Sequence, residues 1–107
     1  MAITNQMADQ AILSALGSRL ARIRLNQNVS QAALAELAGV TPLTVHNVES
    51  GANANMRSVI RVMRALGITA NLEAAFPELP VSPIQAAERE ARQRRKASGN
   101  RRRADSA

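Results

Sequence analysis

A short segment from Thr41 to Ser50 carries several side chains whose types and spacing suit contact with a partner. Thr41 is a good N-cap and Pro42 suits the first helical position, so a helix is expected to begin here. At helical spacing, Val45 and Val48 point to one side of this helix. The residues left to face outward are Leu43 and three polar residues, Thr44, His46 and Asn47, rather than a solubilising mixture of charges.

A second short helix comes before this segment, and the two form a pair. Ser30 is a good N-cap, and apolar residues follow at helix-like spacing up to Ala38. Gly39 can take the positive φ that ends a helix. Helices this short are not stable alone, so they need neighbours on their apolar side. The stretch Ser30–Gly51 is typical of a helix-turn-helix, whose second helix can enter a DNA major groove.

The sequence lacks the residue sets that enzymes use. There is no Cys, which excludes disulfides, zinc fingers and thiol nucleophiles. His46 is the only His, so no second imidazole can join it on a metal ion. There is also no Ser/His/Asp set, Gly-rich phosphate loop or paired-carboxylate pocket. We therefore predict no catalytic residue, no metal and no cofactor.

Composition predicts an all-α protein. The single Phe and the absence of Tyr and Trp leave Leu, Ile, Val, Ala and Met to build the core, and no alternating β-branched run predicts a sheet. The first residues lack a basic region followed by an apolar run, and no segment is apolar enough to span a membrane. We expect no membrane partner and a cytoplasmic, nucleoid-associated protein.

The net charge of +6 is unevenly distributed along the 107 residues. Residues 1–84 hold six arginines against five acidic residues, whereas residues 85–107 hold seven arginines and one lysine against three acidic residues. Such a tail suggests a polyanion, an acidic protein surface or simple solubility. The basic excess therefore belongs mostly to the end of the chain.

Apolar periodicity predicts a first helix from Asp9, as its cap, to about Asn26. Its expected buried stripe consists of four residues, Leu13, Leu16, Leu20 and Ile23. Gly17 within this stripe weakens the helix by roughly 1 kcal/mol relative to Ala, and it permits a close helix crossing.

After Gly51, Asn55 is expected to cap a fourth helix that Gly67 ends. In it, one face is apolar (Val59, Val62, Met63 and Leu66) and the other is basic (Arg57, Arg61 and Arg64). A short fifth helix, 72–76, is expected to place Phe76 as a plug of the domain's end or a dimer contact.

The domain is predicted to cover residues 9–77 and the linker and basic tail residues 78–107. In the tail, a Ser82–Gln85 capping box starts a helix to about Lys96. We expect Ser98-Gly99-Asn100 to break it and residues 101–107 to be disordered in isolation.

Residues 16–68 resemble the lambda-repressor/Cro-type helix-turn-helix family, often called the Xre family. The matching residues are Leu16-Gly17, Leu20, Ile23-Arg24, Ser30-Gln31, Leu34-Ala35, Ala38-Gly39-Val40, Thr44-Val45, Val48-Glu49, Gly51 and Ala65-Leu66-Gly67. The resemblance implies a five-helix lambda-repressor-like domain. The loop after Gly51 departs from the commonest pattern, because it is one residue short and lacks the usual proline. In this it is similar to a HipB-like antitoxin subgroup.

The resemblance also implies roles for individual residues. Gln31 would bind a DNA phosphate through its side chain or its backbone amide, and Arg24 with Glu49 would form a buried ion pair between the first and the recognition helix. The residues that would lie on DNA are Thr41 just before the recognition helix 42–50, then Pro42, Leu43, Thr44, His46 and Asn47 on that helix, and Asn53, Asn55 and Arg57 near phosphate. Because Pro42 and Leu43 replace polar residues, the site should lean towards T/A base pairs, with Leu43 on a thymine methyl and Asn47 on an adenine.

For several of these residues a second interpretation stays open. His46 is as readily a solvated side chain as a DNA contact, and Asn53 and Asn55 are loop and cap residues first. The tail is a solvated run of charge, an arm along DNA, or a segment that folds on an acidic toxin. We predict a repressor that binds double-stranded DNA as a homodimer on a palindrome. The alternative is an antitoxin that binds a toxin protein through residues 82–107 and represses its own operon.

Overall fold

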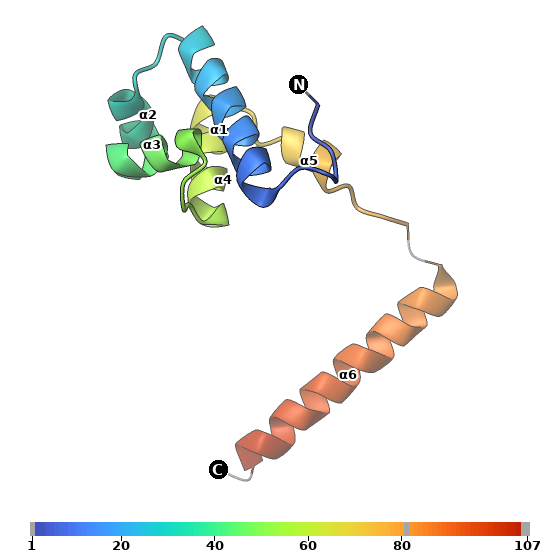
Figure 1. The fold of residues 1–107 in the computed structure, drawn as a ribbon. Helices are drawn as coiled ribbons and strands as arrows, with labels where there is room; N and C mark the ends of the chain where they lie inside the picture. Colours follow the sequence, from blue (N-terminus) through green and yellow to red (C-terminus); the bar gives the residue numbers. More distant parts are fainter. Residues whose placement is uncertain (1, 81, 106–107) are drawn as a thin grey trace. The chain divides into compact units, whose positions relative to one another are not determined.

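The computed structural model describes residues 2–80 and 82–105, with side chains up to residue 97. The described chain is all-helical (Figure 1), with six helices. They are α1 (Asp9–Asn26), α2 (Gln31–Ala38), α3 (Pro42–Ser50), α4 (Met56–Leu66), α5 (Asn71–Ala75) and α6 (Pro83–Asp105). The chain divides into two compact units, residues 1–76 and 77–107. The all-α prediction is thus confirmed, and α6 adds a sixth helix after the five expected ones.

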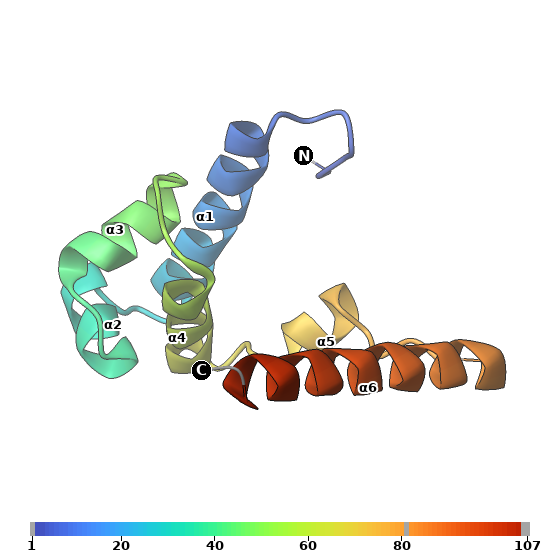
Figure 2. The same ribbon diagram turned by 90° about the horizontal axis from the view of Figure 1, so that it is seen from below.

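The first unit is built around the apolar sides of α2, α3 and α4 (Figure 2). Leu34, Val45 and Val62, one from each of these helices, are completely buried at its centre. Around them lie Ala35 and Leu66, and part of the α1 surface closes the core. Removing this apolar surface from water stabilises helices that are too short to persist separately.

Three helices begin at the caps that the sequence predicts. Ser30, Thr41 and Asn55 each accept a hydrogen bond from the backbone N–H three residues later, at 3.1, 3.1 and 2.8 Å. These bonds satisfy N–H groups that the first turn of a helix leaves without an intrahelical partner. Gly39 ends α2 with φ of +69°, a left-handed conformation that residues with a Cβ adopt only under strain.

Gly17 is the point of closest approach between α1 and α3. A Cβ atom on it would collide with the carbonyl oxygens of Val48 and Glu49 at the end of α3. These are backbone atoms, so they cannot rotate away as a flexible side chain could. The predicted close crossing is therefore present, and its partner is α3.

Two details predicted for α1 are wrong. The cap is Ala8, which has no side chain to accept a hydrogen bond, while Asp9 lies inside the first turn. In the predicted stripe, Leu20 packs against the core, but Leu13 and Leu16 are each 46% exposed. Gly17 is buried against the end of α3, and Gly51 lies against the backbone of Leu13 and Ser14, so the first half of α1 packs through a face other than that of the two leucine side chains.

The short helix α5 does not close the end of the domain. It contributes no buried residue, and Phe76 after it is 71% exposed. The predicted plug role for Phe76 is therefore wrong, and only its role as a dimer contact stays a prediction.

The last helix is longer than predicted. Its start follows the expected capping box, in which Gln85 N–H donates to Ser82 Oγ at 3.2 Å and Ser82 N–H donates to Gln85 Oε1 at 3.3 Å. The predicted break at residues 98–100 and the disorder of residues 101–105 are wrong, because α6 continues to Asp105. A Gly inside a helix costs only about 1 kcal/mol, and the arginines around it favour helix. Residues 106–107 lie outside the described part.

The Gly17 crossing yields a stability prediction. Gly17→Ala should lower the free energy of unfolding by about 1–2 kcal/mol, because the clash with two carbonyl groups exceeds the gain in helix propensity. The neighbouring, exposed Ser18→Ala is the matched control and should change stability by less than about 0.5 kcal/mol. Urea unfolding followed by circular dichroism measures both. A stabilised Gly17→Ala variant would contradict the close approach.

Candidate nucleic-acid interface

The turn between α2 and α3 is fixed by local hydrogen bonds. Val40 N–H donates to the carbonyl oxygen of Ala35 at 3.0 Å, which closes the end of α2. Thr41 Oγ1 caps α3 and also lies 2.9 Å from Thr44 Oγ1, so the two hydroxyl groups share a hydrogen bond. The start of α3 is therefore rigid before any partner binds, but the Thr44 hydroxyl is partly engaged by the protein itself.

The inner and outer sides of α3 differ as predicted. Val45 is completely buried and Val48 is 5% exposed. On the outer side Leu43 is 66% exposed, His46 is exposed, and Thr44 and Asn47 are half-buried. Within the described part of the chain, the side-chain amide of Asn47 forms no hydrogen bond, whereas its backbone carbonyl accepts from the Ser50 hydroxyl at 3.2 Å and from Ala52 N–H at 2.9 Å. This amide is available to a ligand.

An ion pair between α1 and α3 fastens the recognition helix. Arg24 Nε lies 2.6 Å from Glu49 Oε2 and Arg24 Nη2 lies 3.0 Å from Oε1, a two-pronged geometry. Arg24 Nη1 donates to the carbonyl oxygen of Val29 at 2.8 Å, so the guanidinium also holds the segment before α2. The side chains are only 10% and 7% exposed. This is the pair that the resemblance implies.

The surroundings of the pair raise the pKa of Arg24 and lower the pKa of Glu49, so both shifts favour the charged forms. The hydrogen bonds that Arg24 donates to Glu49 raise the pKa of Arg24 above its ordinary value, although burial acts in the opposite direction. Burial by itself would raise the pKa of Glu49, but hydrogen bonds from Arg24 and Gln31 outweigh it. Together with the nearby charges of Arg24 and His46, they hold this pKa below its ordinary 4.5.

Of the two groups of Gln31 expected to reach a phosphate, the side chain is engaged within the protein. Its side-chain Nε2 donates to Glu49 Oε1 at 3.0 Å, so this nitrogen completes the buried pair instead of facing a ligand. The backbone N–H of Gln31 is at the first position of α2, where no intrahelical acceptor exists for it. A phosphate contact by Gln31 would therefore come from its backbone.

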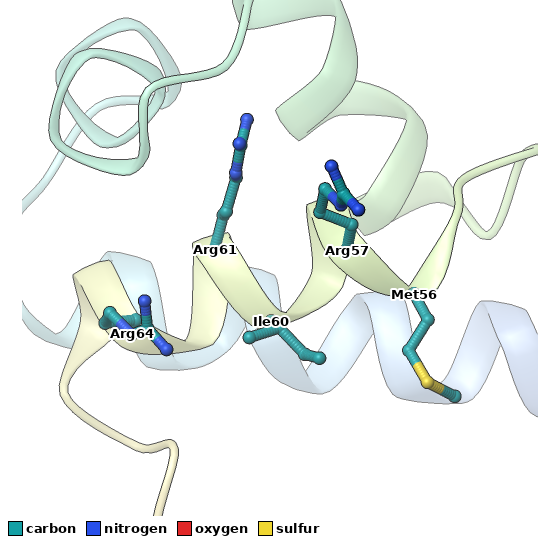
Figure 3. Close-up of a pocket in the computed structure, with 5 residues that line it drawn as sticks. All are labelled: Met56, Arg57, Ile60, Arg61 and Arg64. Carbon is teal, nitrogen blue, oxygen red and sulfur yellow. The ribbon is translucent and has the colours of Figure 1, made fainter.

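The remaining predicted residues lie around the loop before α4 and on α4 itself. Asn53 is exposed, whereas Asn55 uses its side-chain oxygen as the cap of α4. Arg57 and Arg61 extend from one side of α4, and Met56 and Ile60 point to another (Figure 3). With Arg64 these residues line a hollow of about 460 Å³. Arg57 is thus exposed near the start of α4, free to approach an anion.

Two glutamines that the sequence analysis missed also hold the interface in place. Gln10 Nε2 donates to the carbonyl oxygen of Gly51 at 2.9 Å, and Gln27 Nε2 donates to that of Leu66 at 2.9 Å. They bind the two ends of α1 to the ends of α3 and α4. No periodicity identifies them, because their acceptors lie 41 and 39 residues away along the chain.

The family model described as a helix-turn-helix domain matches residues 15–76, from α1 to the end of α5. The chain belongs to this family. It is a DNA-binding helix-turn-helix protein, of a family that is typically non-enzymatic. Comparison with curated proteins finds no match.

Two further properties of this helix-turn-helix protein follow from the described residues. None of their helices is long and apolar enough to cross a membrane. Among the same residues, no group of three or more His, Cys, Asp or Glu side chains could hold a metal ion.

The Glu49 carboxylate yields a pH prediction. Because its pKa is lowered in the folded protein, its stabilisation is present above its ordinary pKa near 4.5 and is lost as the pH falls through the folded value. Glu49→Gln should lower the free energy of unfolding by about 3 kcal/mol at neutral pH, since it leaves Arg24 buried without its charge partner. It should also flatten the loss of stability below about pH 5.

Urea unfolding at a series of pH values measures both effects. Glu73→Gln, on the exposed surface of α5, is the matched control and should keep the acid response of the original protein. If Glu49→Gln lost stability on acidification as steeply as the original protein, the pair would not be the acid-sensitive element.

Proposed function

We propose that this protein is a transcriptional repressor that binds double-stranded DNA sequence-specifically, as a homodimer on a palindromic operator. The observation that carries the proposal is the state of α3. Its inner side is buried, its far end is fixed by the Arg24–Glu49 pair, and its outer side presents an unbonded amide on Asn47. A rigid helix with free hydrogen-bonding groups on one side is suited to a major groove. Residues 9–77 carry this function in the proposal, in the cytoplasm and on the nucleoid.

The side chains on α3 suggest which bases are read. The Asn47 amide has a donor and an acceptor that match N7 and N6 of adenine, and exposed Leu43 offers apolar contact to a thymine methyl. Thr44 is a weaker candidate because its hydroxyl already bonds to Thr41. Pro42 has no polar group to offer, and His46 lies at the margin. We therefore expect an operator that is rich in T/A base pairs.

Phosphate contacts would position this helix without reading sequence. The candidates lie near the ends of the short helices, and each is either exposed or has a free backbone N–H. They are Gln31, Thr41, Asn53, Asn55 and Arg57. Of these, Arg57 is the only one with a full charge. Asn55 retains only its side-chain nitrogen for this purpose, because the oxygen caps α4.

Dimerisation is proposed because one helix of nine residues reads too few base pairs for high specificity. Exposed apolar side chains in the same unit support contact with a second copy. Leu13 and Leu16 on α1 are each 46% exposed, and Phe76 is 71% exposed. In such a dimer the half-sites would lie about 34 Å apart, one helical turn of DNA.

Selection of bound duplexes from a random pool tests the function directly. We expect an enriched palindrome with half-sites about one helical turn apart, rich in T/A pairs, and two protein chains on each selected duplex. Stoichiometry is measured by sedimentation of the purified complex. A pool without enrichment, or one chain on each duplex, would contradict sequence-specific binding by a dimer.

The selected duplex then allows a test of base reading. Asn47→Ala should weaken binding to it by about 1–3 kcal/mol and leave binding to an unrelated duplex unchanged. Asn71→Ala, which removes the same amide at the start of α5, is the control and should bind both duplexes as the original protein does. Equal weakening of Asn47→Ala on both duplexes would mean that Asn47 does not read a base.

An antitoxin is the second candidate function, and α6 is the observation that favours it. This helix begins with its own capping box and lies outside the compact unit that contains α3. In this proposal, residues 82–107 bind and neutralise a toxin protein while α3 represses the shared operon. Placement of the protein in the antitoxin subgroup of the Xre family is part of the same proposal.

Co-expression with the product of the neighbouring gene tests the antitoxin function. A stable complex that is lost when residues 82–107 are deleted is the expected result. Deletion should leave the thermal unfolding of the helix-turn-helix unit unchanged, which separates loss of binding from loss of folding. Absence of any complex with the full chain would remove this candidate.

A further inference from the structure

The helix α6 makes no use of the apolar core. Each described side chain from Ser82 to Ala97 is exposed, and Ile84 is the one large apolar residue among them. The segment nevertheless has a defined helix start, a length of 23 residues and most of the positive charge of the chain. A helix that gains nothing from the core but carries this charge is suited to a partner of opposite charge.

The basic residues of α6 fall into two groups that differ in their contacts. Arg94 Nη2 lies 3.9 Å from Glu90 Oε2, and Arg95 Nε donates to the carbonyl oxygen of Ala91 at 3.4 Å. These two guanidinium groups are engaged within the helix. In the part of α6 whose side chains the structure describes, Arg89, Arg92 and Lys96 form no hydrogen bond or ion pair, although Glu88 is one turn before Arg92.

The three unengaged residues share one face. At 3.6 residues per turn, positions 89, 92 and 96 (i, i+3 and i+7) lie within about 60° of one another. We call Arg89, Arg92 and Lys96 the basic stripe of α6. It covers about 10 Å along the axis at 1.5 Å per residue, and three further arginines follow at 101–103 in the same helix.

We propose that α6 is a second, sequence-independent DNA-binding element that contacts backbone phosphates through this basic stripe. The inference rests on the DNA-binding function proposed above. The helix is about 35 Å long, close to one turn of DNA, so it can follow a groove or the backbone beside the operator half-site. Phosphates need only positive charge at the surface, which is what the stripe offers.

An acidic protein surface fits α6 less well. Protein interfaces depend on a buried centre of apolar and aromatic anchors. After Ile84, the apolar residues of the described part of α6 are only alanines. The lack of large apolar side chains does not weaken binding to DNA, because counterion release from phosphates supplies most of the affinity of sequence-independent contacts.

In this proposal the two units contribute differently to DNA binding. Residues 1–84 are nearly balanced in charge, so α3 and its surroundings supply discrimination between sequences but little general attraction. The basic stripe supplies the general attraction. Because α6 is tethered to the reading unit, its contacts raise the effective concentration of that unit at DNA.

Two double variants with the same change in net charge test the proposal in the full-length chain. R92Q/K96Q removes two charges from the basic stripe, whereas R94Q/R95Q removes two that are engaged within the helix. The probe is a short DNA duplex of arbitrary sequence, and its affinity is measured across a range of salt concentrations. For R92Q/K96Q we expect a salt slope shallower by about 1.8 and an affinity roughly ten-fold lower at low salt. R94Q/R95Q should keep most of the original salt slope and most of the original affinity at low salt.

The outcomes separate face-specific contact from other effects. Equal effects of the two variants would show general attraction without a binding face, and no effect of either would show a solvated helix. Either result overturns the proposal. A stripe-dependent complex with poly-glutamate but not with the duplex would also overturn it, in favour of an acidic protein partner.

Two controls separate this test from a loss of helix in α6 and from base reading by α3. Circular dichroism of each variant shows whether α6 remains helical. Asn71→Ala, outside the proposed interface, should bind the arbitrary duplex with the original salt slope. The arbitrary duplex carries no operator sequence, so a failure of base reading by α3 would leave the result for α6 intact. Conversely, loss of the stripe effect would leave sequence discrimination by α3 unchanged.

Discussion

The structure depends on how the end of α3 is fixed to α1. Two charges that are almost removed from water are tolerable only because Arg24 and Glu49 meet in a two-pronged geometry and because Val29 and Gln31 satisfy their remaining hydrogen-bonding groups. Gly17 lets the two backbones approach closely enough for this contact. The same few atoms thus determine the angle of the recognition helix, the acid sensitivity of the domain and the role of Gln31.

This fastening explains why the outer side of α3 can be weakly charged and still serve as an interface. In the proposed function, a helix that is already rigid loses little conformational entropy when it binds, so a few uncharged groups such as the Asn47 amide would suffice to discriminate between bases. General attraction to a polyanion then has to come from elsewhere in the chain. In the proposal this attraction comes from α6, because most of the excess positive charge lies at the end of the chain and none of the described side chains of α6 is buried.

The relation between sequence and structure differs from one kind of feature to another. The caps at Ser30, Thr41 and Asn55 were predictable because each uses a side chain and an N–H only three residues apart. The exposure of Leu13 and Leu16 was not predictable, because periodicity shows which face of a helix is apolar but not whether neighbouring helices cover that face. The continuation of α6 through residues 98–100 was missed because weak helix formers lower helix stability without prohibiting it.

By itself, the sequence determined the all-α class, the helix-turn-helix with its caps and turn, and the separation of the basic tail from a nearly neutral domain. These features depend on local hydrogen bonds, on apolar periodicity and on composition. Only the tertiary structure decided that the Gln31 side chain supports Glu49, that Gln10 and Gln27 hold the ends of α1, and that Gly17 faces the carbonyl groups of α3. Each of these contacts joins residues 18 to 41 positions apart, and which residues meet at that separation is set by the packing of whole helices.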